Sequence, residues 1–130
     1  GLTEHFEIDS AGTADWHTGK RPDARMITAA GARGIEMKGH ARQVEPNDFS
    51  SFDYIFAMDR SNYEDLLEVQ SRCDKPTAQL LLFCTLCEAH EEDEVPDPYY
   101  GGPEGFEKVL DLLQDGCRAF LERWETGELP

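Results

Sequence analysis

Hydrophobic residues in this chain follow two different periods. The longest pattern lies near the end of the sequence, where apolar side chains recur every three or four residues. These residues are Phe106, Val109, Leu110, Leu113, Cys117, Phe120, Leu121 and Trp124. Such spacing places side chains on one face of a helix. The pattern therefore predicts a long amphipathic helix from about Phe106 to Trp124.

Three shorter apolar runs are typical of strands. Phe52 to Met58 is compact, mostly apolar and bounded by polar residues, as expected for a buried strand of a parallel sheet. Ala78 to Phe83 has the same character. Phe6 to Ile8 is a shorter candidate, which ends at a turn of small residues at Ser10 to Gly12.

Helix-start and helix-end residues lie between these runs. Pro22 suits the first turn of a helix to about Arg33, and Gly34 suits its left-handed end. Asp59 can cap a helix to about Val69, because its carboxylate can accept backbone amides. Strands that alternate with helices indicate an α/β domain with a parallel sheet.

Composition limits the range of functions. The chain has 130 residues, so residues 1–130 are expected to form a single domain. No apolar run reaches the length of a membrane span, and no secretory signal opens the sequence. Four cysteines without secretory features indicate reduced thiols and a cytoplasmic location. The net charge of −15 argues against nucleic-acid binding, which needs clustered cations.

The stretch Val95 to Gly102 reads VPDPYYGG and holds the best candidate for chemistry. Its two prolines stiffen the loop that presents the Asp97 carboxyl. The rings of Tyr99 and Tyr100 could line a narrow pocket that binds a flat aromatic group. An acid beside such a pocket suits protonation of an aryl leaving group. Taken alone, these eight residues fit a surface turn with a solvated Asp and packed tyrosines even better.

The order of motifs along the chain resembles that of the low-molecular-weight protein tyrosine phosphatases. The resemblance runs from about Asp9 to Trp124. Its motifs are DSAGT from Asp9, Trp16 with Gly19, PDAR from Pro22, ARQ from Ala41, FDYIFAMDRSN from Phe52, and DPYYGG from Asp97 followed by GFE from Gly105.

The resemblance implies a flavodoxin-like fold, a doubly wound parallel sheet in three α/β/α layers. In that family an amino-terminal unit supplies the central first strand, a C-x5-R-S phosphate-binding loop and the first helix. Gly1 to Phe6 resembles the part just after that helix, so a unit of about 30 residues is expected to be absent here. Two inner strand edges would then lack partners, and we expect these residues alone not to form the family's sheet, or to dimerise through those edges.

The resemblance also implies a reaction. The family's loop cysteine attacks phosphorus, and Asp97 matches the general acid that protonates the tyrosyl oxygen and then acts as a base toward water. The expected substrates are phosphotyrosine proteins or small aryl phosphates. The family's chemistry needs no metal or cofactor. Because this chain lacks the loop cysteine, we predict that it has no phosphatase activity on its own.

Five further positions take roles from the same resemblance. Trp16, Tyr99 and Tyr100 match residues that line the family's substrate crevice, where aromatic faces hold the phenyl ring. Ser10 and Asp59 resemble residues near the phosphate loop, and we expect them to support loop and strand ends by hydrogen bonds.

The cysteines offer weaker alternatives. The only C-x5-R spacing, Cys117 to Arg123, lies in a helical pattern without a glycine that would let amides converge on an anion, so Cys117 is predicted to be a small core residue. Cys84 and Cys87 have redox-motif spacing, with His90 three residues on. The favoured interpretation is two thiols at the end of a buried strand, over a redox pair or a zinc site.

Two other functions stay open at this point. One is a non-catalytic, phosphatase-like binding or scaffold protein. The other is a different enzyme of the same fold, such as an arsenate reductase or a phosphoarginine phosphatase. Trp16 and the tyrosine pair favour an aryl phosphate. The acidic run from Glu88 to Glu94 is interpreted as a solvated loop, with recognition of a basic partner as the alternative.

Overall fold

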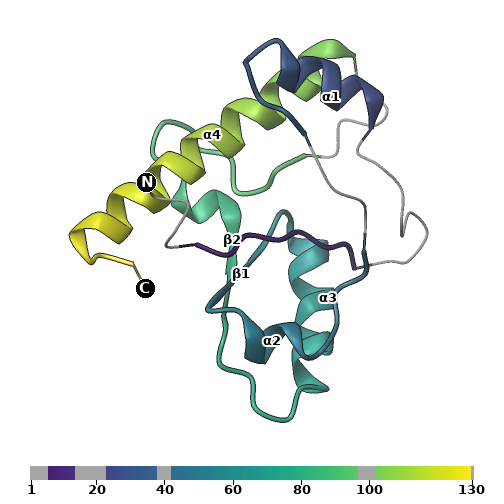
Figure 1. Ribbon diagram of the computed structural model, residues 1–130, viewed down its shortest axis with the longest axis vertical. Helices are drawn as coiled ribbons and strands as arrows, with labels where there is room; N and C mark the ends of the chain where they lie inside the picture. The colour runs from purple at the N-terminus through teal and green to yellow at the C-terminus, as the bar shows by residue number, and fades with distance from the viewer. Residues whose placement is uncertain (1–5, 14–22, 38–41, 97–101, 130) are drawn as a thin grey trace.

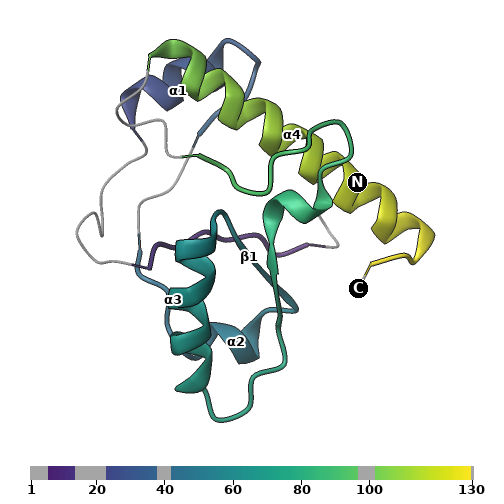
Figure 2. The same ribbon diagram turned by 180° about the vertical axis from the view of Figure 1, so that it is seen from behind.

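Two parallel strands form the sheet in the described part of the chain, with helices on both sides (Figures 1 and 2). The computed structural model describes residues 6–13, 23–37, 42–96 and 102–129. In chain order the elements are helix α1 (Ala24–Gly31), helix α2 (Asp48–Ser51), strand β1 (Tyr54–Ala57), helix α3 (Arg60–Ser71), strand β2 (Gln79–Leu82), 3₁₀ helix η2 (Phe83–Leu86) and helix α4 (Pro103–Thr126). Both views place α2 and α3 on one side of the strands, and α1 and α4 on the other.

The strands alternate their side chains between two cores. β1 and β2 pair in parallel from Tyr54 opposite Gln79 to Ala57 opposite Leu82. Ala57 faces the α3-side core, whose buried members are Phe49, Ala57, Leu66, Val69 and Ala78. Phe56 faces the α4-side core, whose buried members are Phe83, Cys84, Leu86, Val95, Val109 and Leu112. Alternation with period two lets a four-residue strand contribute to both cores.

Helix α4 confirms the predicted amphipathic helix and is slightly longer than predicted. It begins at Pro103, whose missing N–H is no loss at the first helical position, and Gly127 ends it in the left-handed region at φ 75°. Within it, Gly116 has a packing role. A methyl group at this position would overlap the ring of Phe83, so only glycine lets η2 lie this close to α4.

Two predicted helices form with caps. The Asp59 carboxylate accepts a hydrogen bond from the amide of Asn62 at 2.7 Å, which confirms the predicted cap of α3. α1 begins at Ala24 rather than Pro22, because the Asp23 side chain accepts the amide of Arg25 at 2.8 Å and acts as its cap. Gly34 has the left-handed conformation predicted for it, with φ 77°.

The strand predictions need three corrections. β1 and β2 are shorter than their apolar runs, and Phe83 begins η2 instead of ending a strand. Phe6 to Ile8 forms no strand, because its backbone has no ladder partner among the described residues. The segment that follows Ile8 makes an isolated parallel bridge, between Gly12 and Gln43.

The sequence did not predict helix α2. In the described part of the chain, no helix is both long and apolar enough to cross a membrane.

Candidate active site

The carboxyl end of β1 is where the chain leading to Asp97 returns to the sheet. The amide of Val95 donates to the carbonyl oxygen of Met58, the residue after β1, at 2.7 Å. Val95 is buried in the α4-side core. Pro96 follows it, and so the predicted acid loop starts at this edge. Ligand sites in open α/β sheets lie at the carboxyl ends of strands.

The N-terminus of α3 lies at the same edge and receives two carboxylates. Asp59 caps the amide of Asn62, as described above, and the Oε2 atom of Glu94 accepts the amide of Arg60 at 2.6 Å. The first amides of a helix have no partner within the helix, and its positive dipole end favours anions. Asp93 pairs with the Arg60 guanidinium at 2.6 Å. Asp59 therefore fixes the start of α3 directly after β1, while its role beside a phosphate loop stays a prediction.

The start of the acidic segment is fixed by one buried carboxylate on α4. Asp115 accepts hydrogen bonds from the amides of Glu88 and Ala89, at 3.1 and 3.0 Å, and contacts Nδ1 of His90 at 2.7 Å. Arg118 adds a further hydrogen bond at 3.2 Å. Burial opposes ionisation of Asp115, but the hydrogen bonds with His90 and with the amides of Glu88 and Ala89 outweigh it and lower its pKa to about 2.

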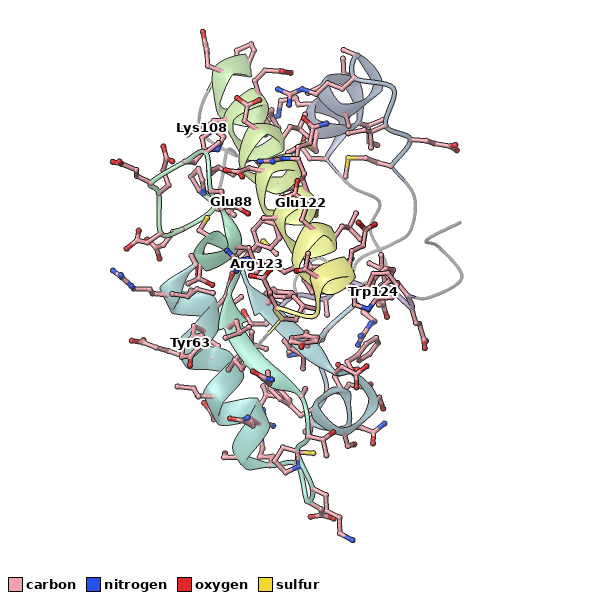
Figure 3. All side chains as sticks on the ribbon, turned by 90° about the vertical axis from the view of Figure 1, so that its left-hand side faces the viewer. Tyr63, Glu88, Lys108, Glu122, Arg123 and Trp124 are labelled. Carbon is pink, nitrogen blue, oxygen red and sulfur yellow. The ribbon has the colours of Figure 1, made fainter. Side chains whose placement is uncertain are left out.

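The acidic segment is a largely exposed loop, as predicted, but side-chain contacts also hold it in place. Besides the contacts of Asp115, Lys108 on α4 pairs with Glu92 at 2.5 Å. Figure 3 shows Lys108 and Glu88 on the same flank of α4. Three elements therefore hold residues 88–95: α4 at the start, and β1 and α3 at the end.

A groove of about 500 Å³ lies between this segment and α3. Most of its polar lining is acidic. The lining residues are Asp59, Ser61, Glu92, Asp93, Glu94, Val95, Pro96 and Lys108. Pro96, the residue before Asp97, is one of these lining residues, so the groove reaches the start of the predicted acid loop.

The segment Asp9 to Thr13, which contains the predicted supporting residue Ser10, is held mainly by an arginine. Arg42 pairs with Asp9 at 3.1 Å and forks onto both carboxylate oxygens of Asp48 at 3.1 and 3.2 Å. The hydrogen bond with Asp48 outweighs desolvation and raises the pKa of Arg42. The amide of Gly12 donates to the carbonyl oxygen of Arg42 at 2.8 Å. Ser10 is exposed, and its amide donates to the Asp9 side chain.

The remaining predicted site residues lie outside the described residues. These are Trp16, Asp97, Tyr99 and Tyr100, and their roles stay predictions. The site-supporting contacts of Glu94, Asp115 and Arg42 were missed. Asp115 lies three residues after Leu112 and four before Ala119, both buried positions of α4, but the predicted apolar face included neither of them.

The cysteines fit a structural role. Cys84 is buried in η2, and the thiol of Cys87 donates to the carbonyl oxygen of Leu112 at 3.5 Å. Burial raises the pKa of Cys84, and it raises the pKa of Cys87 to about 12, so the reactive thiolate is disfavoured at both positions. The prediction that Cys117 is a core residue is wrong: its side chain is exposed, while Gly116 beside it is buried.

Comparison with known proteins agrees with this geometry. Residues 1–127 match the family model described as low molecular weight phosphotyrosine protein phosphatase. The Synechocystis sp. protein slr0328, named as a low molecular weight protein-tyrosine-phosphatase, is 44% identical over 121 residues, which are 93% of this chain and 76% of that protein. The low molecular weight phosphotyrosine protein phosphatase of Schizosaccharomyces pombe is 40% identical, over 94% of this chain and 78% of its own length.

Solved structures give the same result. A crystal structure of a protein tyrosine phosphatase from Entamoeba histolytica, with Hepes in the active site, matches with a TM-score of 0.90 and 41% identity, covering 98% of this chain and 81% of that one. A crystal structure of a Drosophila arginine phosphatase matches with a TM-score of 0.84 and 30% identity, covering 95% and 82%. The resemblance found in the sequence and the α/β class with a parallel sheet are confirmed. This chain belongs to the low molecular weight phosphotyrosine protein phosphatase family.

Proposed function

We propose that this chain carries the proton-donating side of a protein tyrosine phosphatase that hydrolyses phosphotyrosine or small aryl phosphates. The observation that carries the proposal is the hydrogen bond from Val95 to Met58, which brings the chain before Asp97 to the carboxyl end of β1. The matches to named phosphatases support the same chemistry.

The proposed reaction has two steps. A cysteine thiolate attacks phosphorus, the bond from phosphorus to the tyrosyl oxygen breaks, and Asp97 gives its proton to that oxygen. Asp97 then takes a proton from the water that attacks the cysteinyl phosphate, which releases phosphate and the thiolate. Trp16, Tyr99 and Tyr100 hold the aryl ring in this scheme, while Ser10 and Asp59 support the ends of their segments.

The nucleophile is the second part of the proposal. The 130 residues contain no C-x5-R-S sequence, and Cys117 to Arg123 lies inside α4, where the helix already uses the backbone amides. We therefore propose that these residues alone hydrolyse no phosphate ester. β1 pairs only with β2 among the described residues, so its other edge is open to an added strand or to a second copy of this chain.

A direct test compares the full-length natural protein with residues 1–130, using p-nitrophenyl phosphate and phenyl phosphate. The full-length protein should turn over both esters, and residues 1–130 should turn over neither. In the full-length protein, Asp97→Asn should lower kcat for phenyl phosphate by about 10²- to 10⁴-fold, and less for the better leaving group. Asp74→Asn, an exposed change of the same charge, is the control. Equal, small losses for both esters would contradict the role of Asp97.

Phosphoarginine is a second candidate substrate. The likeness to a Drosophila arginine phosphatase favours it, and the acidic groove beside the loop would attract a guanidinium group. Arsenate reduction is less favoured, because burial holds Cys84 and Cys87 in their thiol form. A phosphorylated peptide pair, one with phosphotyrosine and one with phosphoarginine, separates the two phosphatase activities. A full-length protein that binds but hydrolyses neither peptide would support the scaffold alternative.

We also propose that residues 1–130 form one domain and act in the cytoplasm. The free thiols of all four cysteines support a reducing compartment. Localisation of the tagged full-length protein and limited proteolysis test the two parts.

A further inference from the structure

Glu94 makes an unusual contact for a residue of an acidic surface segment. Its side chain is half-buried, and its Oε2 atom lies 2.6 Å from the amide nitrogen of Arg60. Arg60 is the first residue of α3, so its amide has no partner within the helix. A carboxylate at this position gains a charge-assisted hydrogen bond and a favourable interaction with the helix dipole.

The residue after Glu94 is bound to the same junction. The amide of Val95 donates to Met58, and its side chain is 7% exposed, within the α4-side core. Two successive residues therefore fix the chain to the junction of β1 and α3, one through a side chain and one through the backbone. Pro96 comes next and has a fixed φ. Asp97 follows Val95 by two residues, and two extended residues span at most about 7.2 Å.

We propose that Glu94 is a positioning residue for Asp97: its hydrogen bond to Arg60 fixes the direction in which the chain leaves the β1–α3 junction toward the acid. The inference rests on the proposed role of Asp97 as the proton donor. Asp93 does not have this function, since its pair with the Arg60 guanidinium joins side chains that are 60% and 65% exposed. Such exposed pairs contribute little.

The consequence for catalysis follows from the distance that proton transfer needs. A donor must come within about 2.6–3.2 Å of the leaving oxygen, and a displacement of about 1 Å can cost about 10²-fold in rate. Loss of the Glu94 contact should therefore lower kcat most for esters that need the proton. KM should stay near the parent value, because Glu94 is placed to hold the chain and not the substrate.

The test uses the full-length natural protein and three variants. Glu94→Ala removes the contact. Glu94→Gln keeps an oxygen that can accept the Arg60 amide. Glu91→Ala removes an exposed charge three residues earlier in the same segment and is the matched control. For each protein, kcat and KM are measured with phenyl phosphate and with p-nitrophenyl phosphate, whose leaving groups differ in basicity.

We expect Glu94→Ala to lower kcat for phenyl phosphate by about 10- to 100-fold and for p-nitrophenyl phosphate by less than about 3-fold. Glu94→Gln should recover most of the loss, and Glu91→Ala should match the parent. A second measurement needs no turnover: amide hydrogen exchange at Val95 should become about 10-fold faster in Glu94→Ala and stay near the parent rate in Glu94→Gln.

Two kinetic results would overturn the proposal. One is an active parent whose Glu94→Ala variant keeps the parent's ratio of rates on the two esters. The other is a Glu94→Gln variant that loses as much as Glu94→Ala, because then the hydrogen bond is not what matters. A parent that hydrolyses neither ester overturns the proposed function instead, while unchanged exchange at Val95 in Glu94→Ala still overturns the anchoring by itself.

Discussion

Residues 6–8 and strand β1 have similar composition but different structures. Tyr54–Ala57 pairs with β2 along its whole length and is covered on both faces. Phe6 to Ile8 has no ladder partner among the described residues, and Ile8 is 87% exposed. Only Phe6 packs, with its ring 4.9 Å from that of Trp124. Apolar composition thus makes a strand possible, and a partner edge decides whether it forms.

Residues 9–13, which follow residues 6–8 along the chain, are also held by forces different from those that hold β1. β1 is fixed by core burial on both faces, whereas residues 9–13 are held by Arg42 and a single bridge to Gln43. Burial of one large apolar side chain contributes about 1.5–3 kcal/mol, while an exposed ion pair contributes about 0–1 kcal/mol. Substitutions around β1 and α4 should therefore cost much more stability than substitutions around residues 9–13.

The largest expected effect comes from the packing of η2 against α4. Gly116→Val should lower the free energy of unfolding by about 3 kcal/mol, because its side chain would overlap the Phe83 ring. Gly31→Ala is the control: Gly31 is also helical, but a methyl group there meets nothing within 4 Å, so it should stabilise by about 0.5–1 kcal/mol. Urea unfolding measures both. Equal effects at the two glycines would mean that the Phe83 contact is not tight.

The next effect comes from Asp115. Asp115→Ala should cost about 2 kcal/mol, because it removes the acceptor of the Glu88 and Ala89 amides. The effect depends on pH, since the pKa of Asp115 is lowered from 3.8 to about 2 in the folded state. This contribution is fully present above about pH 4 and is lost as the pH falls toward 2. The stability difference between the parent and Asp115→Asn should shrink over that range, and a constant difference would contradict the lowered pKa.

A smaller effect is expected at the cap of α3. Asp59→Ala should cost about 1 kcal/mol, because the amide of Asn62 loses its acceptor. Asp59→Asn should cost only a few tenths, since asparagine caps almost as well. Thermal unfolding of the two variants measures the difference. Identical melting temperatures would mean that the hydrogen bond from the Asn62 amide to residue 59 contributes nothing measurable.

The smallest effect should come from the weakly held region. Asp9→Ala should lower the free energy of unfolding by less than about 1 kcal/mol, because its pair with Arg42 joins side chains that are 49% and 34% exposed, and Arg42 keeps its pair with Asp48. Hydrogen exchange at the Gly12 and Val44 amides should still become faster, since these amides join residues 9–13 to residues 42–44. A loss as large as that of Gly116→Val would refute the contrast between the two regions.

The elements set by local chemistry could be predicted from the sequence. The three- and four-residue spacing predicted α4, and Asp59 predicted the start of α3. Contacts between distant residues were not predictable in this way. Leu112 and Ala119 are fully buried although the predicted apolar face did not include them, and Leu112 packs with the residues of η2 in the α4-side core.

The candidate site shows the same division. Asp59 was predicted because a cap acts on amides a few residues away. Glu94 and Asp115 were missed because their partners lie 34 and about 26 residues away along the chain. An acidic run in a sequence looks the same whether its carboxylates face water or helix amides. The partners of such a run come from tertiary structure alone.

The contact of Phe83 with Gly116 has a consequence for the evolution of this protein. The aromatic ring fills the space that a β-carbon at position 116 would need. A larger residue at 116 is therefore tolerated only together with a smaller one at 83, and single changes at either position open a void or create a clash. Across related sequences, these two positions should vary as a pair.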